Sequence, residues 1–203
     1  MIKHLIILLT AIISFPQCFA AEKASDILDR TAKKFSSAPS ISAYYTISSA
    51  NGTSSGEMLF AGQKFHIKSP ELLTWYDGTT QWSYLPSENE VNISEPTAEE
   101  LQSVNPFTII STFKRGYTAK VVKTDKSVKV ITLTAQSKKA EIQSATLTIN
   151  ALTMLPSRID LKMLSGQKAT ITITRLSIGK QVNINAFRFP AKKYPGVETV
   201  DLR

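Results

Sequence analysis

Only one histidine, His66, follows residue 20, so it decides whether triad chemistry is open to this chain. A catalytic serine, histidine and acid must lie together, with the imidazole next to the serine and held by the carboxylate. His66 alternates with Lys64 and Lys68 on the polar side of a predicted strand, and no nucleophile elbow is predicted around a serine. The sequence therefore predicts a surface histidine rather than a catalytic base.

Metal and phosphate chemistry find no support in the sequence either. A metal site needs several cysteine, histidine or acidic side chains close together, and no such cluster appears. The chain has eight glycines, and they form no loop that would cradle a phosphate. Asp77-Gly78 is typical of a tight turn rather than of a catalytic acid. These patterns favour a protein that is not an enzyme and that uses no metal and no cofactor.

The first twenty residues have the layout of a secretory signal peptide. A short basic start precedes an apolar stretch from Leu5 to Phe15, and small residues at Cys18 and Ala20 place a cut before Ala21. The apolar stretch is shorter than the roughly 20 residues that a membrane-spanning helix needs. Residues 1–20 are therefore predicted to be removed, which predicts an exported, periplasmic protein.

Cys18 is the only cysteine, and it leaves a second interpretation of this segment open. In a bacterial lipoprotein, a cysteine at the cleavage point is acylated and tethers the protein to a membrane. Such sites have a small residue directly before the cysteine, whereas Gln17 stands there. If Cys18 leaves with the signal, the mature chain contains no disulfide. An acylated Cys18 would instead make the protein a membrane-tethered acceptor or surface protein.

Residues 21–203 are predicted to form a single domain with a positive net charge. The chain has 24 basic and 16 acidic residues and a net charge of +8, and loss of Lys3 leaves +7. A basic surface suits an anionic membrane, an acidic protein or nucleic acid. Because no aromatic–basic stripe or nucleic-acid motif accompanies the lysines, we expect a membrane face or an acidic protein as partner, and no nucleic acid. A monomer is expected.

Hydrophobic periodicity predicts one helix followed by many strands. Ile27, Leu28, Thr31 and Phe35 follow helical spacing before the break at Pro39, and Asp26 and Arg30 are spaced as an i, i+4 pair. The predicted strands are residues 41–49, 58–61, 64–68, 72–76, 79–84, 90–94, 117–123, 128–135, 141–149, 155–163, 168–176 and 197–202.

The middle of the chain interrupts the strands with helical signals. Thr97 and Glu100 fit a capping box, and Pro106 suits the first turn of a short apolar helix that extends to Phe113 and stops at Gly116. The expected architecture is mainly β (α+β), with about 11–12 strands and about three helices. A sheet of this length does not stay flat and should curl into a barrel or half-barrel.

Motifs in a fixed order extend over most of residues 21–203. They are Ser25-Asp26-Ile27-Leu28, Tyr44-Tyr45, Gly56-Glu57-Met58-Leu59-Phe60, the block of residues 76–86, Asn105-Pro106-Phe107, Phe187-Arg188-Phe189-Pro190 and Gly196-Val197-Glu198. The block of residues 76–86 is similar to a D-G-x-x-x-W-x-Y-x-P hairpin. Together these motifs resemble the LolA-like family of outer-membrane lipoprotein carriers, as a divergent branch.

This resemblance implies an antiparallel, unclosed half-barrel whose concave apolar face is covered by helices. Between sheet and helices the family has a cavity for the acyl chains of lipoproteins. Exposing a chain of about fifteen methylenes to water costs about 12 kcal/mol, at about 0.8 kcal/mol each. A lipoprotein therefore needs a cover to cross an aqueous compartment, and the implied function is to ferry lipoproteins from the inner to the outer membrane.

The implied acyl-chain site consists of strand residues and of residues on the short apolar helix. The expected lining residues are Met58, Phe60, Phe65, Ile67, Trp82, Tyr84, Phe107, Ile110, Phe113, Ile171 and Ile173. Residues 106–113 are expected to form a movable lid over the strand residues. The alternative is a fixed core helix at the same place.

The resemblance also implies partners, and this sequence departs from the family pattern at one position. An ABC-type release complex in the inner membrane would load the carrier, and an outer-membrane acceptor or the membrane itself would receive the cargo. Family members carry an arginine after the second strand that bonds to the lid, whereas Gly62 or Ser69 occupies that place here. A lipid-binding sensor or regulator of the same fold is the alternative function.

Overall fold

The computed structural model describes residues 22–98, 100–101, 105 and 107–203. The predicted signal peptide, the fate of Cys18 and the role of Pro106 at a helix start lie outside these residues.

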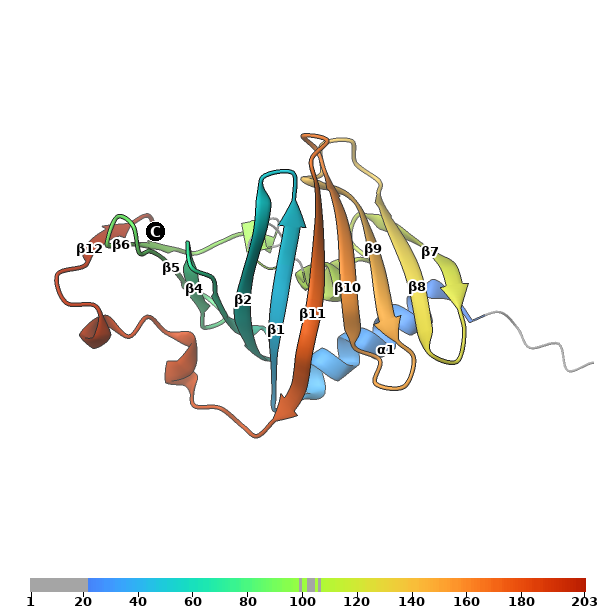
Figure 1. Cartoon of the computed structure of the whole chain (residues 1–203), viewed down its shortest axis with the longest axis horizontal. Coiled ribbons are helices and arrows are strands. Elements are labelled where there is room, and N and C mark those ends of the chain that lie inside the picture. The colour runs from blue at the N-terminus through green and yellow to red at the C-terminus, as the bar shows by residue number, and fades with distance from the viewer. Residues whose placement is uncertain (1–21, 99, 102–104, 106) are drawn as a thin grey trace, which may run out of the picture.

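Twelve strands form one sheet that does not close on itself (Figure 1). The sheet order is β12-β6-β5-β4-β3-β2-β1-β11-β10-β9-β8-β7, and all neighbours are antiparallel except β12 and β6. The bounds are β1 Ser40–Ser49, β2 Gly52–Ala61, β3 Lys64–Lys68, β4 Leu73–Tyr76, β5 Gln81–Leu85, β6 Glu90–Ser94, β7 Tyr117–Thr124, β8 Val128–Ala135, β9 Ile142–Asn150, β10 Pro156–Met163, β11 Lys168–Gly179 and β12 Glu198–Asp201. The predicted mainly β, unclosed half-barrel class is confirmed.

Helices lie before and between the two blocks of strands. α1 spans Ala24–Ser37 and α3 spans Thr108–Thr112, and the 3-10 helices η1 (Ile184–Phe187) and η2 (Ala191–Lys193) follow the last long strand. Ala98, Glu100 and Leu101 are also helical. The predicted capping box starts this turn, because the Glu100 carboxylate accepts from the Thr97 N–H (2.7 Å) and the Glu100 N–H donates to the Thr97 hydroxyl (3.3 Å). Among the described residues, no helix has the length and apolar character that crossing a membrane requires.

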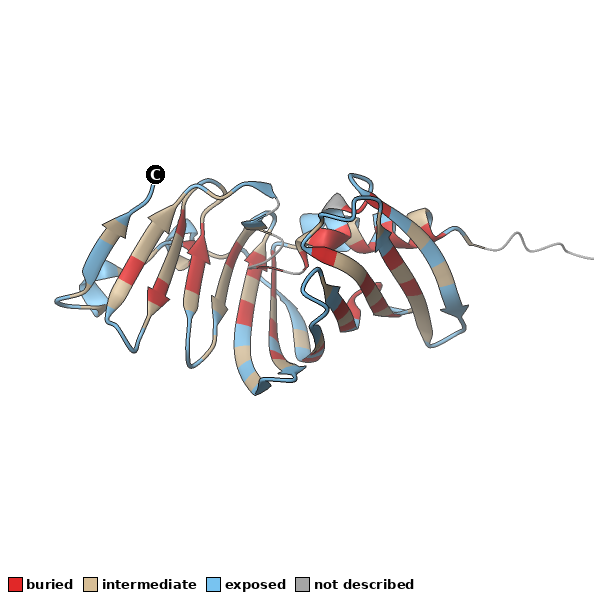
Figure 2. Ribbon diagram, turned by 90° about the horizontal axis from the view of Figure 1, so that it is seen from above, coloured by how far each residue is buried: buried red, intermediate tan, exposed pale blue. Residues whose placement is uncertain are grey.

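The two faces of the sheet differ in polarity, and α1 and α3 cover only the apolar one. We call the covered face the inner face and the opposite one the outer face. Buried and exposed residues alternate along the long strands (Figure 2), as expected when side chains point to opposite faces in turn. Ile27 and Leu28 of α1 are fully buried in one cluster with inner-face residues such as Ile131 and Leu133 of β8. The main core therefore lies between the inner face and these helices.

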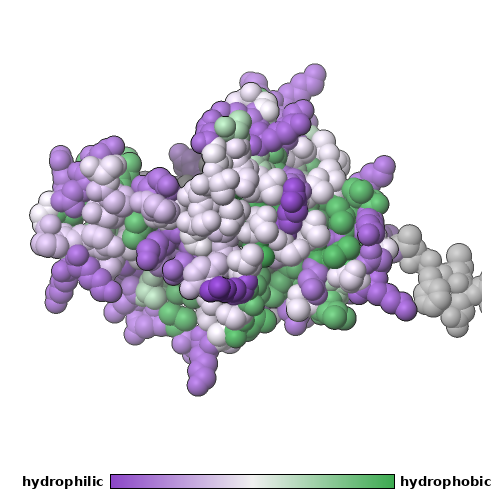
Figure 3. Space-filling model, in the orientation of Figure 1, coloured by the Kyte–Doolittle hydropathy of each residue, from purple (hydrophilic) through white to green (hydrophobic). Residues whose placement is uncertain are grey.

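The outer face is built largely from serine and threonine along the central strands. Cross-strand hydroxyl pairs join Ser42 to Ser177 (2.9 Å) and Thr46 to Ser55 (3.0 Å). α1 runs behind the sheet in Figure 1, so Figure 3 shows this outer face, and the central strands are mostly pale or purple. The apolar surface that could cover an extended apolar ligand therefore lies on the inner face.

One part of the outer face is covered, namely β4–β6 under the C-terminal segment. Here Trp75, Tyr84 and Val91 are buried, and side chains of the segment pack on them; we call this group, with Leu73, Trp82, Phe189, Tyr194 and Val197, the outer cluster. The segment runs from β11 to the far edge of the sheet, where it adds β12 parallel to β6 (Figure 1). The predicted last strand therefore exists, but its pairing departs from the antiparallel pattern.

Asp77 joins the hairpin between β4 and β5 to the C-terminal segment. Its carboxylate accepts from the backbone N–H of Thr79 (3.2 Å) and Thr80 (3.1 Å) and from Arg188 (3.0 Å). Gly78 has φ +107, a conformation that side chains disfavour. Burial alone would raise the pKa of Asp77, but the two backbone donors and the Arg188 guanidinium outweigh it and lower the pKa. The turn prediction at Asp77-Gly78 is confirmed.

Gly56 makes room for a buried aromatic side chain across β1 and β2. A Cβ atom at this position would collide with the backbone oxygen of Lys68 and would lie 2.5 Å from the Tyr45 hydroxyl. The Tyr45 hydroxyl donates to the same Lys68 oxygen (3.4 Å). Burial, with a smaller contribution from the Glu71 carboxylate, raises the pKa of Tyr45.

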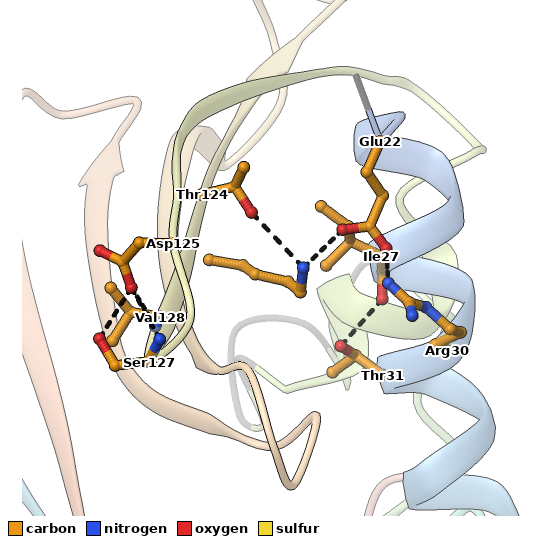
Figure 4. Close-up of polar contacts among 9 residues, drawn as sticks. Glu22, Ile27, Arg30, Thr31, Thr124, Asp125, Ser127 and Val128 are labelled. Atoms are coloured by element: carbon orange, nitrogen blue, oxygen red, sulfur yellow. Dashed lines mark hydrogen bonds and ion pairs between the residues drawn. The ribbon is translucent and has the colours of Figure 1, made fainter. Parts of the chain in front are cut away.

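An ion-pair network fastens the start of α1 to β8. Glu22 pairs with Arg30 on α1 and with the half-buried Lys129 (2.5 Å), as Figure 4 shows around the labelled Glu22. The i, i+4 spacing predicts that Arg30 pairs with Asp26. In the structure Arg30 pairs with Glu22 instead. The cause is that Glu22, just before the helix, can reach both cations at once.

Candidate functional site: a cavity between the sheet and the helices

An apolar cavity of about 370 Å³ lies between α1, α3 and the inner face near β2 and β3. This volume is within the range of about 300–1,000 Å³ that is usual for small-molecule sites. The lining residues are Ala32, Phe35, Ser36, Phe60, Gly62, Gln63, Phe65, Tyr76, Ala98, Leu101, Asn105, Phe107, Thr108, Ile110, Ser111 and Arg115.

A group of aromatic rings forms one wall of the cavity. Phe60 of β2 lies with its ring centroid 6.1 Å from that of Phe35 on α1 and 5.5 Å from that of Phe107, which directly precedes α3. Phe65 continues the row toward Tyr76, with centroids 5.2 Å apart. Edge-to-face and tilted ring pairs at these separations stabilise one another beyond simple burial. The wall therefore combines side chains from α1, β2, β3, β4 and the residue before α3 into one apolar surface.

α3 and the residue before it also line the cavity, with one side only. Phe107 and Ile110 line the cavity, whereas Ile109 and Phe113 are buried in the main core without lining it. Ile109 and Ile110 are 0% and 1% exposed, so these neighbours are equally buried but face different surroundings. Phe107 and Ile110 thus belong to the core cluster and also border the cavity.

The polar bonds of this helix are mostly local. The Asn105 side chain accepts from the Phe107 N–H (3.1 Å), and the Thr108 hydroxyl donates to the Asn105 carbonyl oxygen (2.7 Å). Toward α1, Lys114 forms an exposed ion pair with Asp29 (2.9 Å). Exposed pairs of this kind stabilise by about 0–1 kcal/mol. Apolar packing therefore holds the helix in place more than these polar bonds do.

Polar side chains gather along the rim of the cavity. Thr108, Ser111 and Arg115 are three and four residues apart, which places them along one side of the helix and its following turn. Ser36 and Gln63 also line the cavity. None of the described residues that line it is acidic.

Four of the predicted site residues line the cavity, and five more lie in the core beside it. Phe60, Phe65, Phe107 and Ile110 line it. The five others belong to, or pack against, the same core cluster on the inner face without lining the cavity; they are Met58, Ile67, Phe113, Ile171 and Ile173.

The expectation that Trp82 and Tyr84 face the short helix is wrong. Trp82 pairs with Trp75, and Tyr84 pairs with Leu73. Directly paired residues share a face, and these two pairs point to the outer face, where they form part of the outer cluster. A shift of one residue across the hairpin reverses the face of a whole strand. The C-terminal segment that covers these rings could not be foreseen from the alternation alone.

Sequence reasoning missed several lining residues. Phe35 and Ala32 lie on α1, which was predicted as a helix but none of whose residues was assigned to the acyl-chain site. Tyr76 ends β4 on the inner face, and Leu101 follows the capping box. The signal for Tyr76 was its position next to Asp77, because the turn fixes the register of β4 against β5.

One serine in the chain stands in a G-x-S-x-G pattern, and the structure places it away from His66. Residues 52–56 match the letters G-x-S-x-G, but they lie within β2, and the Ser54 side chain donates to Glu71 (3.0 Å). His66 lies on the outer face, stacked on Trp75 with centroids 4.6 Å apart, and its Nδ1 donates to the Thr74 carbonyl oxygen (3.1 Å). Ser54 and His66 belong to opposite faces of the sheet. Among the residues that the structure describes, no group of acids, histidines or cysteines could hold a metal ion.

Two solved structures share the fold of this chain at low sequence identity. An uncharacterized conserved protein from Thermus thermophilus is 14% identical, with a TM-score of 0.63 over 89% of this chain and 99% of that chain. A DUF1329 family protein from Desulfovibrio piger is 13% identical, with a TM-score of 0.50 over 83% of this chain and 97% of that chain. The similarity to a LolA superfamily protein from Nitrosomonas europaea is lower, with a TM-score of 0.47 and 13% identity over 84% of this chain and 100% of that chain.

The comparison with curated proteins gives no match. The sequence does match a family model described as outer membrane lipoprotein carrier protein LolA, over residues 14–167. The match includes the capping box, the cavity helix and the hairpin at Asp77-Gly78. This chain therefore belongs to the LolA family of outer membrane lipoprotein carrier proteins.

Proposed function

We propose that this chain is a periplasmic carrier that holds the acyl chains of lipoproteins in the cavity and ferries them from the inner to the outer membrane. Residues 1–20 are removed on export, and residues 21–203 form the carrier domain. The observation that carries the proposal is the apolar cavity between α1, α3 and the inner face, in a chain of a family named for lipoprotein carriage.

The construction of the cavity suits a ligand that must be both covered and released. Its aromatic and aliphatic lining removes methylene groups from water, and each buried methylene stabilises the complex by about 0.8 kcal/mol. α3 is held mainly by apolar contacts, which an entering acyl chain can replace in kind. Binding therefore does not require many specific polar bonds to break.

The charge distribution supports the proposal that one half of the sheet docks to an inner-membrane release complex of the ABC type. Residues 114–180, which form β7–β11, have thirteen basic and three acidic side chains, a net charge of +10. Residues 22–113 have six basic and eleven acidic side chains, a net charge of −5. Because these strands are neighbours in the sheet, the basic half is continuous. An acidic surface on the release complex complements it, and this attraction steers the encounter.

A release assay tests the carrier function. The purified mature chain is added to spheroplasts that retain newly made lipoproteins, and lipoprotein in the supernatant is measured as a complex with the chain. Ala32→Trp fills part of the cavity without opening the core, so it should fold normally and release little lipoprotein. Ala50→Trp, in the exposed turn after β1, should release as much as the wild type. Equal release by the two variants would contradict the proposal.

A matched pair of charge reversals tests the docking half. Lys138 and Lys139 lie exposed between β8 and β9 in the basic half, and Lys192 and Lys193 lie exposed in η2 outside it. Reversal of the first pair to glutamate should weaken binding to the release complex, and the effect should shrink as salt shortens the screening length from about 10 Å at 0.1 M to about 3 Å at 1 M. Equal effects of the two pairs, or binding that does not respond to salt, would remove the docking proposal.

A further inference from the structure

Arg115 places a positive charge at the rim of an otherwise apolar cavity. It lines the cavity, its side chain is exposed, and it has no hydrogen bond or ion pair to any described residue. Its neighbour Lys114 is neutralised by Asp29 (2.9 Å) and does not line the cavity. The two adjacent cations therefore have different roles, and only Arg115 is available to a ligand.

The surroundings of Arg115 match the head of an anionic amphiphile. The Ser111 hydroxyl lies one turn before it on the same side of the helix, and its donor bond goes to the Thr108 carbonyl oxygen (2.9 Å). Gln63, on the turn between β2 and β3 next to Gly62, also lines the cavity. No described lining residue is acidic, so nothing there neutralises the guanidinium. A planar guanidinium with several N–H donors suits the oxygens of a carboxylate or a phosphate.

We infer that the cavity binds acyl amphiphiles with an anionic oxygen head, a carboxylate or a phosphate, and that Arg115 binds the head. This inference rests on the proposed function, because the acyl chain occupies the same cavity. It widens the ligand class beyond lipoproteins to free fatty acids or lipids with a phosphate head. The chain lies against the aromatic wall, and the head remains at the rim, where water is available to it.

The test compares three ligands that share one chain length and differ only in the head. Dodecanoate, dodecyl phosphate and neutral 1-dodecanol are titrated below their aggregation limits into the mature protein by calorimetry. Arg115→Gln should weaken binding of the two anions about three- to fivefold, the size expected for an exposed charge contact, and leave dodecanol unchanged. Arg115→Lys should restore part of the loss. Lys33→Gln, an exposed cation on α1 that does not line the cavity, makes the same charge change as a control.

The outcomes separate this inference from the function on which it rests. If Arg115→Gln weakens binding of only one of the two anions, that anion has the head group that Arg115 recognises, and the inference is supported. Equal losses for all three ligands in Arg115→Gln, or the same loss in Lys33→Gln, would overturn it while the cavity remains an acyl site. Failure of the wild type to bind any of the three would remove the proposed function itself.

Discussion

Replacement of Ile110 by aspartate asks whether α3 is a movable lid or a fixed core helix. Full undocking would expose four buried side chains, Phe107, Ile109, Ile110 and Phe113, at about 1.5–3 kcal/mol each. The total, about 6–12 kcal/mol, equals the stability of a whole domain. A rocking motion that frees only Phe107 and Ile110 needs about half of that, and an entering acyl chain offsets it. We therefore predict a lid that pivots on Ile109 and Phe113.

This geometry makes Ile109→Asp the matched control. Ile109 and Ile110 are equally buried neighbours, but only Ile110 borders the cavity, where a carboxylate can reach solvent as the helix rocks. We expect Ile110→Asp to lose about 2–4 kcal/mol of unfolding free energy and remain folded, and to lose affinity for a fluorescent fatty acid. Ile109→Asp buries an unpaired charge and should unfold the domain.

Urea unfolding followed by tryptophan fluorescence measures both variants, because Trp75 and Trp82 report on the outer cluster, away from the change. Unfolding of both variants would show a fixed core helix and refute the lid. An Ile110→Asp protein that folds and binds the fatty acid at full strength would refute the cavity as the binding site.

Three further predictions concern positions outside the cavity. Gly56→Ala should cost several kcal/mol in urea unfolding, because its Cβ would collide with the Lys68 oxygen, and an unchanged midpoint would contradict this contact. Asp77→Ala should lower the unfolding free energy by about 1–3 kcal/mol, because the bonds to the turn and to Arg188 are lost. Arg188→Gln should lower it less, because the turn bonds remain. Equal losses of unfolding free energy would show that the turn bonds add nothing. Burial lowers the pKa of His66 from 6.5, so the unfolded chain takes up this proton first, and the unfolding free energy should fall as pH drops below about 6.5. His66→Gln should make the thermal midpoint depend less on pH below about pH 6.5, and an unaltered pH dependence there would exclude His66 as the cause.

The long strands and the capping box were predictable because each depends on local chemistry. Alternation identified β8, β10 and β11, and Thr97 with Glu100 formed the expected reciprocal bonds. The cavity wall was predictable only in part. Phe60 and Phe65 follow the alternation, but whether such a residue lines a void or fills the core depends on its neighbours from other elements.

Long-range contacts set the limits of the prediction. Trp82 and Tyr84 alternate as an inner-face pair would, but their pairing with Trp75 and Leu73 puts them on the outer face. There Phe189 and Tyr194 of the distant C-terminal segment pack on Tyr84 and cover this side. The parallel pairing of β12 likewise follows from the path of the C-terminal segment and not from the residues of the strand itself.

The most direct test of the account is a photocrosslink from the cavity in living cells. A benzophenone amino acid at Ser111, an exposed position that lines the cavity, is compared with one at Tyr44, which is 46% exposed outside it. We predict that Ser111 crosslinks to lipoproteins in the periplasm, that Tyr44 does not, and that the crosslinks disappear when the acylated cysteine of the lipoprotein is replaced. Equal crosslinking from both positions, or crosslinks that persist without the acyl chains, would contradict acyl-chain carriage in this cavity.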